Sequence, residues 1–152
     1  MGLRLATIND IEAMHRVRLA VLENRLRDLS RVQLDDYRHM LNSDGRGWVY
    51  ELHEEIVGFA VADHVKRSIW ALFVTPEHEG CGIGRALHDA MVEWLFRVAP
   101  GDVWLTTEPG TRAEHFYSAT GWQRIRLEDN GELRFELRSK PSSNALERTR
   151  SG

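Results

Sequence analysis

One short segment, Glu79 to Gly84, restricts what this chain can fold into more than any other. Glycine occupies positions 80, 82 and 84 within it. The apolar run Ile69–Val74 precedes the segment and predicts a strand that is covered on both faces. Apolar residues at helical spacing follow it from Ile83 to Val98 and predict a helix. A glycine-rich turn between a strand and a helix is typical of a phosphate-binding loop, because the amides at a helix N-terminus attract anions.

The spacing of these glycines disagrees with two common phosphate-binding loops. A P-loop requires Lys and then Ser or Thr after its last glycine, whereas Arg85 and Ala86 follow Gly84. A dinucleotide fingerprint requires G-x-G-x-x-G, and Arg85 or Leu87 stands where the third glycine belongs. The sequence therefore disfavours both a P-loop NTPase and a nucleotide-binding oxidoreductase.

The spacing of apolar residues along the whole chain predicts the order β-αα-βββ-α-β-α-ββ. Three capping-box patterns, Asn9–Glu12, Ser30–Gln33 and Thr111–Glu114, predict where three of the helices begin. The step Asn130-Gly131 predicts a hairpin at the end of the sheet. The expected strands lie at 3–6, 48–52, 56–62, 69–74, 103–107, 125–127 and 133–137. We expect one α/β or α+β domain over residues 1–138 and a polar tail over 139–152.

Composition excludes several classes of function. The formal net charge is −3 and the sequence pI is about 6.2, which argues against a nucleic-acid partner. Cys81 is the one cysteine of the 152 residues, so no intrachain disulfide forms and a reducing compartment is favoured. No apolar stretch is long enough to span a membrane. We therefore expect a cytoplasmic protein without a membrane or nucleic-acid partner.

Two short patterns resemble the start of a zinc-binding helix and then fail to complete it. His53-Glu54 and His78-Glu79 begin like H-E-x-x-H, but Val57 and Gly82 occupy the closing positions. We therefore expect no metal.

Two segments of the chain together resemble the GNAT N-acetyltransferase superfamily. The first, ALFVTPEHEGCGIGRAL, runs from Ala71 to Leu87 and is similar to the family's strand, Val-x-Pro and glycine loop. The second, AEHFYSATGW, runs from Ala113 to Trp122 and fits the family pattern A-x-x-F-Y-x-x-x-G-F/W. The segments stand in the family's order, and the resemblance covers roughly residues 3–138. It implies a mixed, mostly antiparallel central sheet of about seven strands with four flanking helices, splayed between strands 69–74 and 103–107.

The resemblance also implies acetyl-CoA as the acyl donor, held at its pyrophosphate by the backbone amides of the glycine loop. One residue departs from the family pattern, since Glu79 stands where Arg or Gln is usual. Its carboxylate would repel the pyrophosphate unless it points to solvent or pairs with Arg85 or Arg112. The residues expected at acetyl-CoA are Leu72, Phe73, Val74, Glu79, Gly80, Cys81, Gly82, Ile83, Gly84, Arg85, Arg112, Phe116 and Tyr117.

For catalysis, the resemblance places Tyr117 at the general-acid position, where a neutral hydroxyl gives a proton to the departing thiolate. The other interpretation of Tyr117 is a core aromatic. Glu108 is a candidate general base, and Asp63 and His64 are further candidates for the base or for acceptor binding. Each of these three also fits a solvated strand end. Trp70 is a candidate for the acceptor pocket or for the core, while Cys81 is expected to be non-catalytic.

We expect an acetyl-CoA-dependent N-acetyltransferase that transfers acetyl directly to a primary amine of a small molecule or of a peptide N-terminus. The alternative is a non-catalytic CoA-binding sensor or interaction module of the same fold, which the unusual Glu79 favours and Tyr117 disfavours. The terminal hairpin, residues 123–138, offers a free edge, so a homodimer is a further expectation.

Overall fold

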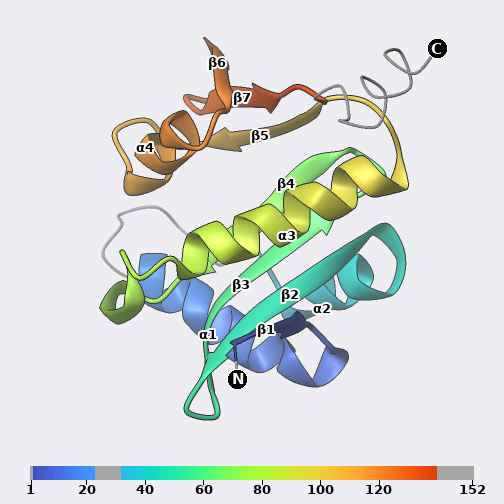
Figure 1. The fold of residues 1–152 in the computed structure, drawn as a ribbon, viewed down its shortest axis with the longest axis vertical. Coiled ribbons are helices and arrows are strands. Elements are labelled where there is room, and N and C mark those ends of the chain that lie inside the picture. The colour runs from blue at the N-terminus through green and yellow to red at the C-terminus, as the bar shows by residue number, and fades with distance from the viewer. Residues whose placement is uncertain (1, 23–31, 140–152) are drawn as a thin grey trace, which may run out of the picture. The chain divides into compact units, whose positions relative to one another are not determined.

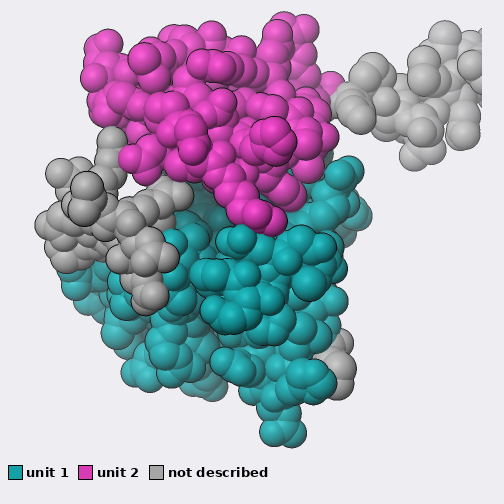
Figure 2. Space-filling view, turned by 90° about the vertical axis from the view of Figure 1, so that its left-hand side faces the viewer, with its two compact units in different colours: residues 1–98 teal, residues 99–152 magenta. Residues whose placement is uncertain are grey.

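The computed structural model describes residues 2–22 and 32–139. The chain divides into two compact units, residues 1–98 and residues 99–152, drawn in different colours in Figure 2. The elements follow the predicted order β-αα-βββ-α-β-α-ββ. Seven strands and four α-helices lie within the described residues, and every strand pairing within each unit is antiparallel. The predicted fold class is thereby confirmed, whereas the single domain and the splay stay predictions.

The first unit contains a four-stranded sheet in the order β1-β2-β3-β4. Its strands are β1 (Gly2–Leu5), β2 (Gly45–Leu52), β3 (Glu55–Asp63) and β4 (Ser68–Val74). The prediction that β2 begins at Trp48 is wrong, because the strand begins at Gly45. A Cβ at Gly45 would lie 2.0 Å from the carbonyl oxygen of Ala62. Glycine is therefore needed here for a close approach of two strands.

Strand β4 carries a bulge at Trp70. Val61 of β3 faces Ala71, but the next residue, Ala62, faces Ile69, so Trp70 is an extra residue in β4. Successive residues of a regular strand point to opposite faces. The bulge breaks this alternation, and both Trp70 and Ala71 pack against the same hydrophobic cluster. Bulges of this kind re-aim side chains and are frequent beside active sites.

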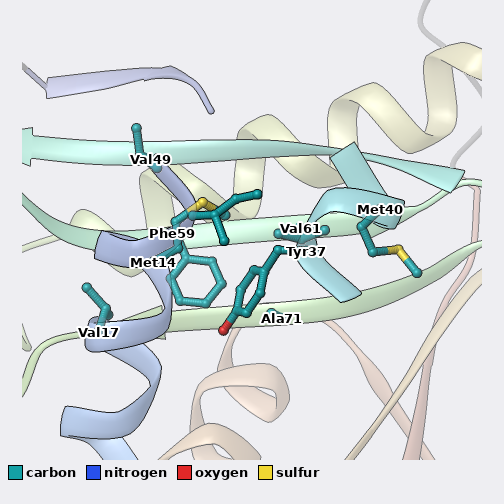
Figure 3. Close-up of a cluster of buried hydrophobic side chains, with 9 residues drawn as sticks. Met14, Val17, Tyr37, Met40, Val49, Phe59, Val61 and Ala71 are labelled. Atoms are coloured by element: carbon teal, nitrogen blue, oxygen red, sulfur yellow. The ribbon is translucent and has the colours of Figure 1, made fainter. Parts of the chain in front are cut away.

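Helices cover both faces of this sheet. Helices α1 (Ile11–Leu22) and α2 (Leu34–His39) enclose one hydrophobic cluster, in which the rings of Tyr37 and Phe59 lie 6.0 Å apart (Figure 3). Helix α3 (Ile83–Val98) packs along strands β2, β3 and β4 (Figure 1). The buried members of the cluster are Ile11, Met14, Val17, Tyr37, Met40, Val49, Phe59, Val61 and Ala71.

The start of α1 differs from the predicted capping box of Asn9 and Glu12. A short 3-10 turn, Ile8–Asp10, precedes the helix. The Thr7 amide donates to Asp10 Oδ2 at 2.8 Å, and Arg4 holds the same carboxylate with hydrogen bonds of 2.9 and 3.0 Å. The box therefore lies two residues earlier, because Arg4 fixes Asp10 in the capping position. The predicted cap Ser30 lies outside the described residues. The N-cap of α2 is Gln33, whose amide donates to Asp36 Oδ2 at 2.7 Å, so the prediction that a Ser30–Gln33 capping box starts this helix is wrong.

The second unit contains a three-stranded sheet in the order β5-β7-β6, with one helix. The elements are β5 (Val103–Thr107), α4 (Arg112–Ala119), β6 (Gln123–Leu127) and β7 (Leu133–Leu137). The predicted cap Thr111 is confirmed, since its hydroxyl accepts the Glu114 amide at 3.3 Å. The Glu114 carboxylate, however, accepts the amide of Gly110 at 2.7 Å. The predicted hairpin is also confirmed, with Gly131 at φ +89° in its turn.

Candidate active site

The glycine loop connects β4 to α3 as the sequence predicts. After a short 3-10 turn, Pro76–His78, the backbone passes through Gly80 at φ +77° and Gly82 at φ +84°. L-residues avoid these angles, so glycine is required for the shape of the loop. A Cβ at Gly82 would meet no atom within 4 Å. The position is thus glycine because of its backbone conformation, and the space beside it is open.

The first amides of α3 are available to a ligand. The helix runs for 16 residues from Ile83, and its first closing hydrogen bond runs from the Ala86 amide to the Gly82 carbonyl at 3.1 Å. The amides before Ala86 have no acceptor within the helix, and the helix dipole adds partial positive charge at this end. Together with the open backbone at Gly82, this end of α3 offers backbone amides and partial positive charge, which suit an anionic group.

Two contacts with β3 fix the loop in place. The Thr75 amide donates to the Val57 carbonyl at 2.8 Å, which anchors the start of the loop. At Gly58, a Cβ would lie 3.0 Å from Leu87 Cδ1 and 3.2 Å from Ile83 Cγ2. The first turns of α3 therefore pack directly over the bare backbone of Gly58. A glycine inside a strand signals such a close approach, and the predicted site had not included Gly58.

Three side chains of the loop and of the first turn of α3 are predicted to lie near the donor: Glu79, Cys81 and Arg85. Glu79 is half-buried, with an extended backbone. Arg85, one of its two predicted partners, directs Nε to Asp89 Oδ1 at 3.1 Å instead, one turn further along the helix. Cys81 is exposed, and its Sγ lies 3.7 Å from the Glu79 carbonyl oxygen. The side chains of Arg85 and Cys81 thus lie at the surface, whereas the left-handed glycines Gly80 and Gly82 set the backbone of the loop.

The predicted cofactor strand lies beside the loop, but two candidate acceptor residues do not. Val74 at the end of β4 faces Gly58, and Phe73 faces Phe59. Asp63 faces Ser68 at the opposite end of the same strand pair, and His64 follows it. The Asp63 carboxylate accepts the Lys66 amide at 3.0 Å and is buried, so it stabilises the turn between β3 and β4. The roles predicted for Asp63 and His64 stay predictions.

In the second unit, Tyr117 is buried among aromatic rings. Its ring centroid lies 5.4 Å from Phe116, 5.6 Å from Trp122 and 6.2 Å from Phe135. The helix ends at Ala119, Gly121 follows with φ +99°, and the Trp122 amide donates back to the Tyr117 carbonyl at 3.1 Å. This is a Schellman closure, and it brings Trp122 onto Tyr117. The predicted C′ glycine is thereby confirmed.

Burial raises the pKa of the Tyr117 hydroxyl above its ordinary value of 10. The side chain therefore keeps its proton throughout the neutral range, as a general acid must. Glu108 stands immediately after β5, and its carbonyl accepts the Thr111 hydroxyl at 2.7 Å, which ties the candidate base to the start of α4. The exposed Arg112 is the first residue of that helix.

The structure brings the predicted site residues together in two groups, one in each unit. The loop and β4 form the first group, while Glu108, Arg112, Phe116 and Tyr117 form the second within one short segment. No cluster of three or more His, Cys, Asp or Glu side chains among the described residues is placed to hold a metal ion. Over the same part of the chain, every helix is too short or too polar to cross a membrane.

Comparison with known proteins defines the class. Residues 11–122 match the acetyltransferase (GNAT) family, so the chain belongs to this family and is an N-acetyltransferase. Both segments that carry the sequence resemblance lie wholly within this match. No curated protein sequence matches the chain significantly.

Solved structures share the fold at low sequence identity. A GNAT-family acetyltransferase from Staphylococcus aureus Mu50 has a TM-score of 0.76 and 19% identity, over 89% of this chain and 96% of that one. The ribosomal-protein-alanine N-acetyltransferase of Brucella melitensis has a TM-score of 0.75 and 20% identity, over 91% and 100%. The PaiA N-acetyltransferase of Thermoplasma acidophilum, solved with coenzyme A, has a TM-score of 0.73 and 14% identity, over 91% and 100%.

Proposed function

We propose that the protein transfers the acetyl group of acetyl-CoA directly to a primary amine of a small molecule or of a peptide N-terminus. One observation carries the choice of donor. The loop from Glu79 to Gly82 takes left-handed backbone angles at two glycines and leads into the amides of a 16-residue helix. Such an arrangement binds pyrophosphate through the backbone, and acetyl-CoA carries one. The coenzyme A complex of PaiA, which shares the fold, supports the same donor.

In this proposal the backbone binds and orients the donor. The amides of Ile83, Gly84 and Arg85 take the pyrophosphate, and main-chain groups of Phe73 and Val74 pair with the pantetheine arm. An amide near Val74 polarises the thioester carbonyl as an oxyanion-hole donor. The carboxylate of the half-buried Glu79 would oppose the negative pyrophosphate unless a cation neutralises it. The loop therefore holds the donor by geometry, with a smaller contribution from charged side chains.

The chemical step needs one proton donor and one proton acceptor. The lone pair of the amine forms a bond to the acetyl carbon, and the bond between that carbon and sulfur breaks. Tyr117 gives its proton to the departing thiolate, since burial keeps the hydroxyl protonated. The proton lost by the amine passes to Glu108, directly or through water. The role of Tyr117 is a prediction that the experiments below address. The role of Glu108, the homodimer and the cytoplasmic location also stay predictions.

A ligand-induced thermal shift tests the donor. Saturation at 100 times Kd stabilises a folded protein by about 2.7 kcal/mol, which raises the Tm of a domain of this size by roughly 5–10 °C. We expect this shift with acetyl-CoA and with CoA, and no shift with NAD or ATP. If neither CoA compound stabilises the protein, the proposal is wrong. Release of free thiol from acetyl-CoA in the presence of an amine panel then identifies acceptors.

A further inference from the structure

A second feature of the first unit lies on the α1 side of the bulged strand. Arg18 of α1 places its guanidinium carbon 5.3 Å from the ring centre of Trp70 and 5.0 Å from that of Phe73. Both aromatic residues belong to β4, the strand that the proposed function assigns to the pantetheine arm. Contact with two ring faces orients a guanidinium, because the ring quadrupoles attract the cation.

This guanidinium retains an unused donor. Arg18 Nη1 is buried and has no hydrogen-bond partner, and it is the one such side-chain atom within residues 2–22 and 32–139. A buried cationic N–H without an acceptor is costly, and native proteins keep few of them. Such an atom points to an acceptor that binds from outside the chain.

The bulge creates this arrangement. In a regular strand Trp70 and Ala71 would point to opposite faces, but the extra residue turns Trp70 onto the α1 side with Ala71. The Tyr37 ring then packs edge-on against Trp70 at 5.2 Å (its position in the cluster is seen in Figure 3). Trp70 and Phe73, with Tyr37 packed against Trp70, therefore form an aromatic wall beside one cation.

The neighbouring polar groups add no second positive charge. The Tyr37 hydroxyl shares a hydrogen bond of 3.0 Å with His15 Nδ1. Burial, together with the nearby charge of Arg18, lowers the pKa of His15, so the imidazole is neutral at pH 7. A single guanidinium between aromatic faces suits a planar monoanion, which it contacts through its fork of N–H groups. A phosphate would call for more donors and cations than the described residues supply here.

We propose that Arg18 binds a carboxylate of the acceptor, so that the preferred substrates are amines that carry a carboxylate close to the amino group. This inference rests on the proposed function and names the substrate class of the same site. The carboxylate has two sources, the α-carboxylate of a free amino acid or the side chain of a peptide that begins with Asp or Glu. Arg18 is a specificity residue that touches the acceptor, and Trp70 and Phe73 position its guanidinium.

Matched pairs of acceptors test the charge requirement. For free amino acids, each acid is compared with its α-amide and with the amine that lacks the carboxyl group. For peptides, those beginning with Asp or Glu are compared with those beginning with Asn or Gln. We expect the carboxylate member of at least one set to have a kcat/KM higher by about tenfold or more, the usual effect of one hydrogen bond to a charged group. The set that shows the preference identifies the source.

Substitution of Arg18 assigns the preference to this residue. In Arg18→Gln the ratio of kcat/KM within a pair falls towards one, because the acid loses activity and the neutral amine keeps it. Arg18→Lys keeps part of the preference, since it retains charge without the fork. The exposed Arg16 of the same helix provides the control, and Arg16→Gln leaves the ratio unchanged. Circular dichroism and the CoA-induced thermal shift confirm that each variant is folded.

The outcomes separate this inference from the proposed function. If CoA compounds do not raise the Tm of the wild-type protein, acetyl-CoA is not the donor and both proposals are wrong. Binding of CoA and acetylation of amines without a carboxylate preference contradicts only the role of Arg18. A preference that survives in Arg18→Gln also contradicts it. If no amine is turned over, stabilisation of the CoA complex by N-acetyl amino acids in the wild type but not in Arg18→Gln is the required result.

Discussion

The two halves of the predicted site depend on different parts of the polypeptide. The glycine loop of the first unit acts through its backbone, since left-handed angles at Gly80 and Gly82 shape it and helix amides line it. The segment around Tyr117 in the second unit acts through one side chain. Its ring packs against Trp122 and Phe135, and burial keeps its hydroxyl protonated. Substitutions should therefore affect binding in one region and chemistry in the other.

The largest effect is expected for Tyr117→Phe. The ring and its aromatic neighbours remain, so the fold and CoA binding are retained, while the proton donor is lost. A general acid contributes about 10²- to 10⁴-fold to rate, and kcat should fall by that factor. Tyr50→Phe on β2, which removes a phenol hydroxyl from a residue outside the predicted site, is the matched control. An unchanged kcat in single-turnover measurements would assign Tyr117 to the core alone.

A smaller effect is expected for Gly82→Ala, which keeps the chemistry and strains the loop. A Cβ meets no atom there, so the cost arises from φ +84°, which amounts to about 1–3 kcal/mol for a non-glycine residue. We expect Kd for CoA to rise about tenfold, measured by calorimetry, with kcat nearly unchanged. Gly131→Ala, at φ +89° in the terminal hairpin, should lose similar stability and keep its CoA affinity. Equal affinities in the two variants would contradict the role of the loop.

The same contrast explains what the sequence could predict. Alternating glycines between a strand and a helix are a backbone pattern, so the loop and the start of α3 could be predicted from residues 69–98. The β2 start and the packing at Gly58 could not, because a glycine in a turn and a glycine beneath a helix look alike until strand register is known. The prediction of Asn9 as the N-cap of α1 is wrong for a related reason. The hydrogen bonds from Arg4 to Asp10 depend on how β1 enters the sheet, which the local sequence does not reveal.

Arg18 was missed because an arginine on an amphipathic helix usually lies in solvent. Its apolar neighbours Met14 and Val17 predicted the buried stripe of α1 correctly. The contact with Trp70, however, requires the bulge in β4, and nothing in the run Ile69–Val74 reveals which residue is extra. Tyr117 is an intermediate case: its position in the A-x-x-F-Y pattern is visible, but the burial that raises its pKa comes from residues further along the chain.

A modest effect, in the opposite direction, is expected for Glu79→Gln. Removing a carboxylate beside a pyrophosphate should tighten CoA binding by about three- to tenfold, since two unit charges about 4 Å apart interact by about 1 kcal/mol in water. The gain should shrink at high ionic strength because salt screens the repulsion. Glu77→Gln, in the preceding 3-10 turn, is the control for net charge. Weaker binding by Glu79→Gln would mean that the carboxylate helps to shape the loop.

The smallest expected effect is an absence of inhibition at high pH, which tests the side-chain half of the comparison alone. Because burial raises the pKa of Tyr117 above 10, kcat at saturating amine should not decline between pH 7 and about pH 9.5.

The pKa of Tyr117 also affects stability, because the folded state holds this proton more tightly than the unfolded chain. The corresponding stability is therefore fully present below the unfolded pKa of about 10 and is lost as pH rises above it. Denaturant unfolding should accordingly show the wild type losing stability relative to Tyr117→Phe only above pH 10. A falling limb of kcat near pH 8 that is absent from Tyr117→Phe would mean that the hydroxyl ionises readily, and then the general acid lies elsewhere.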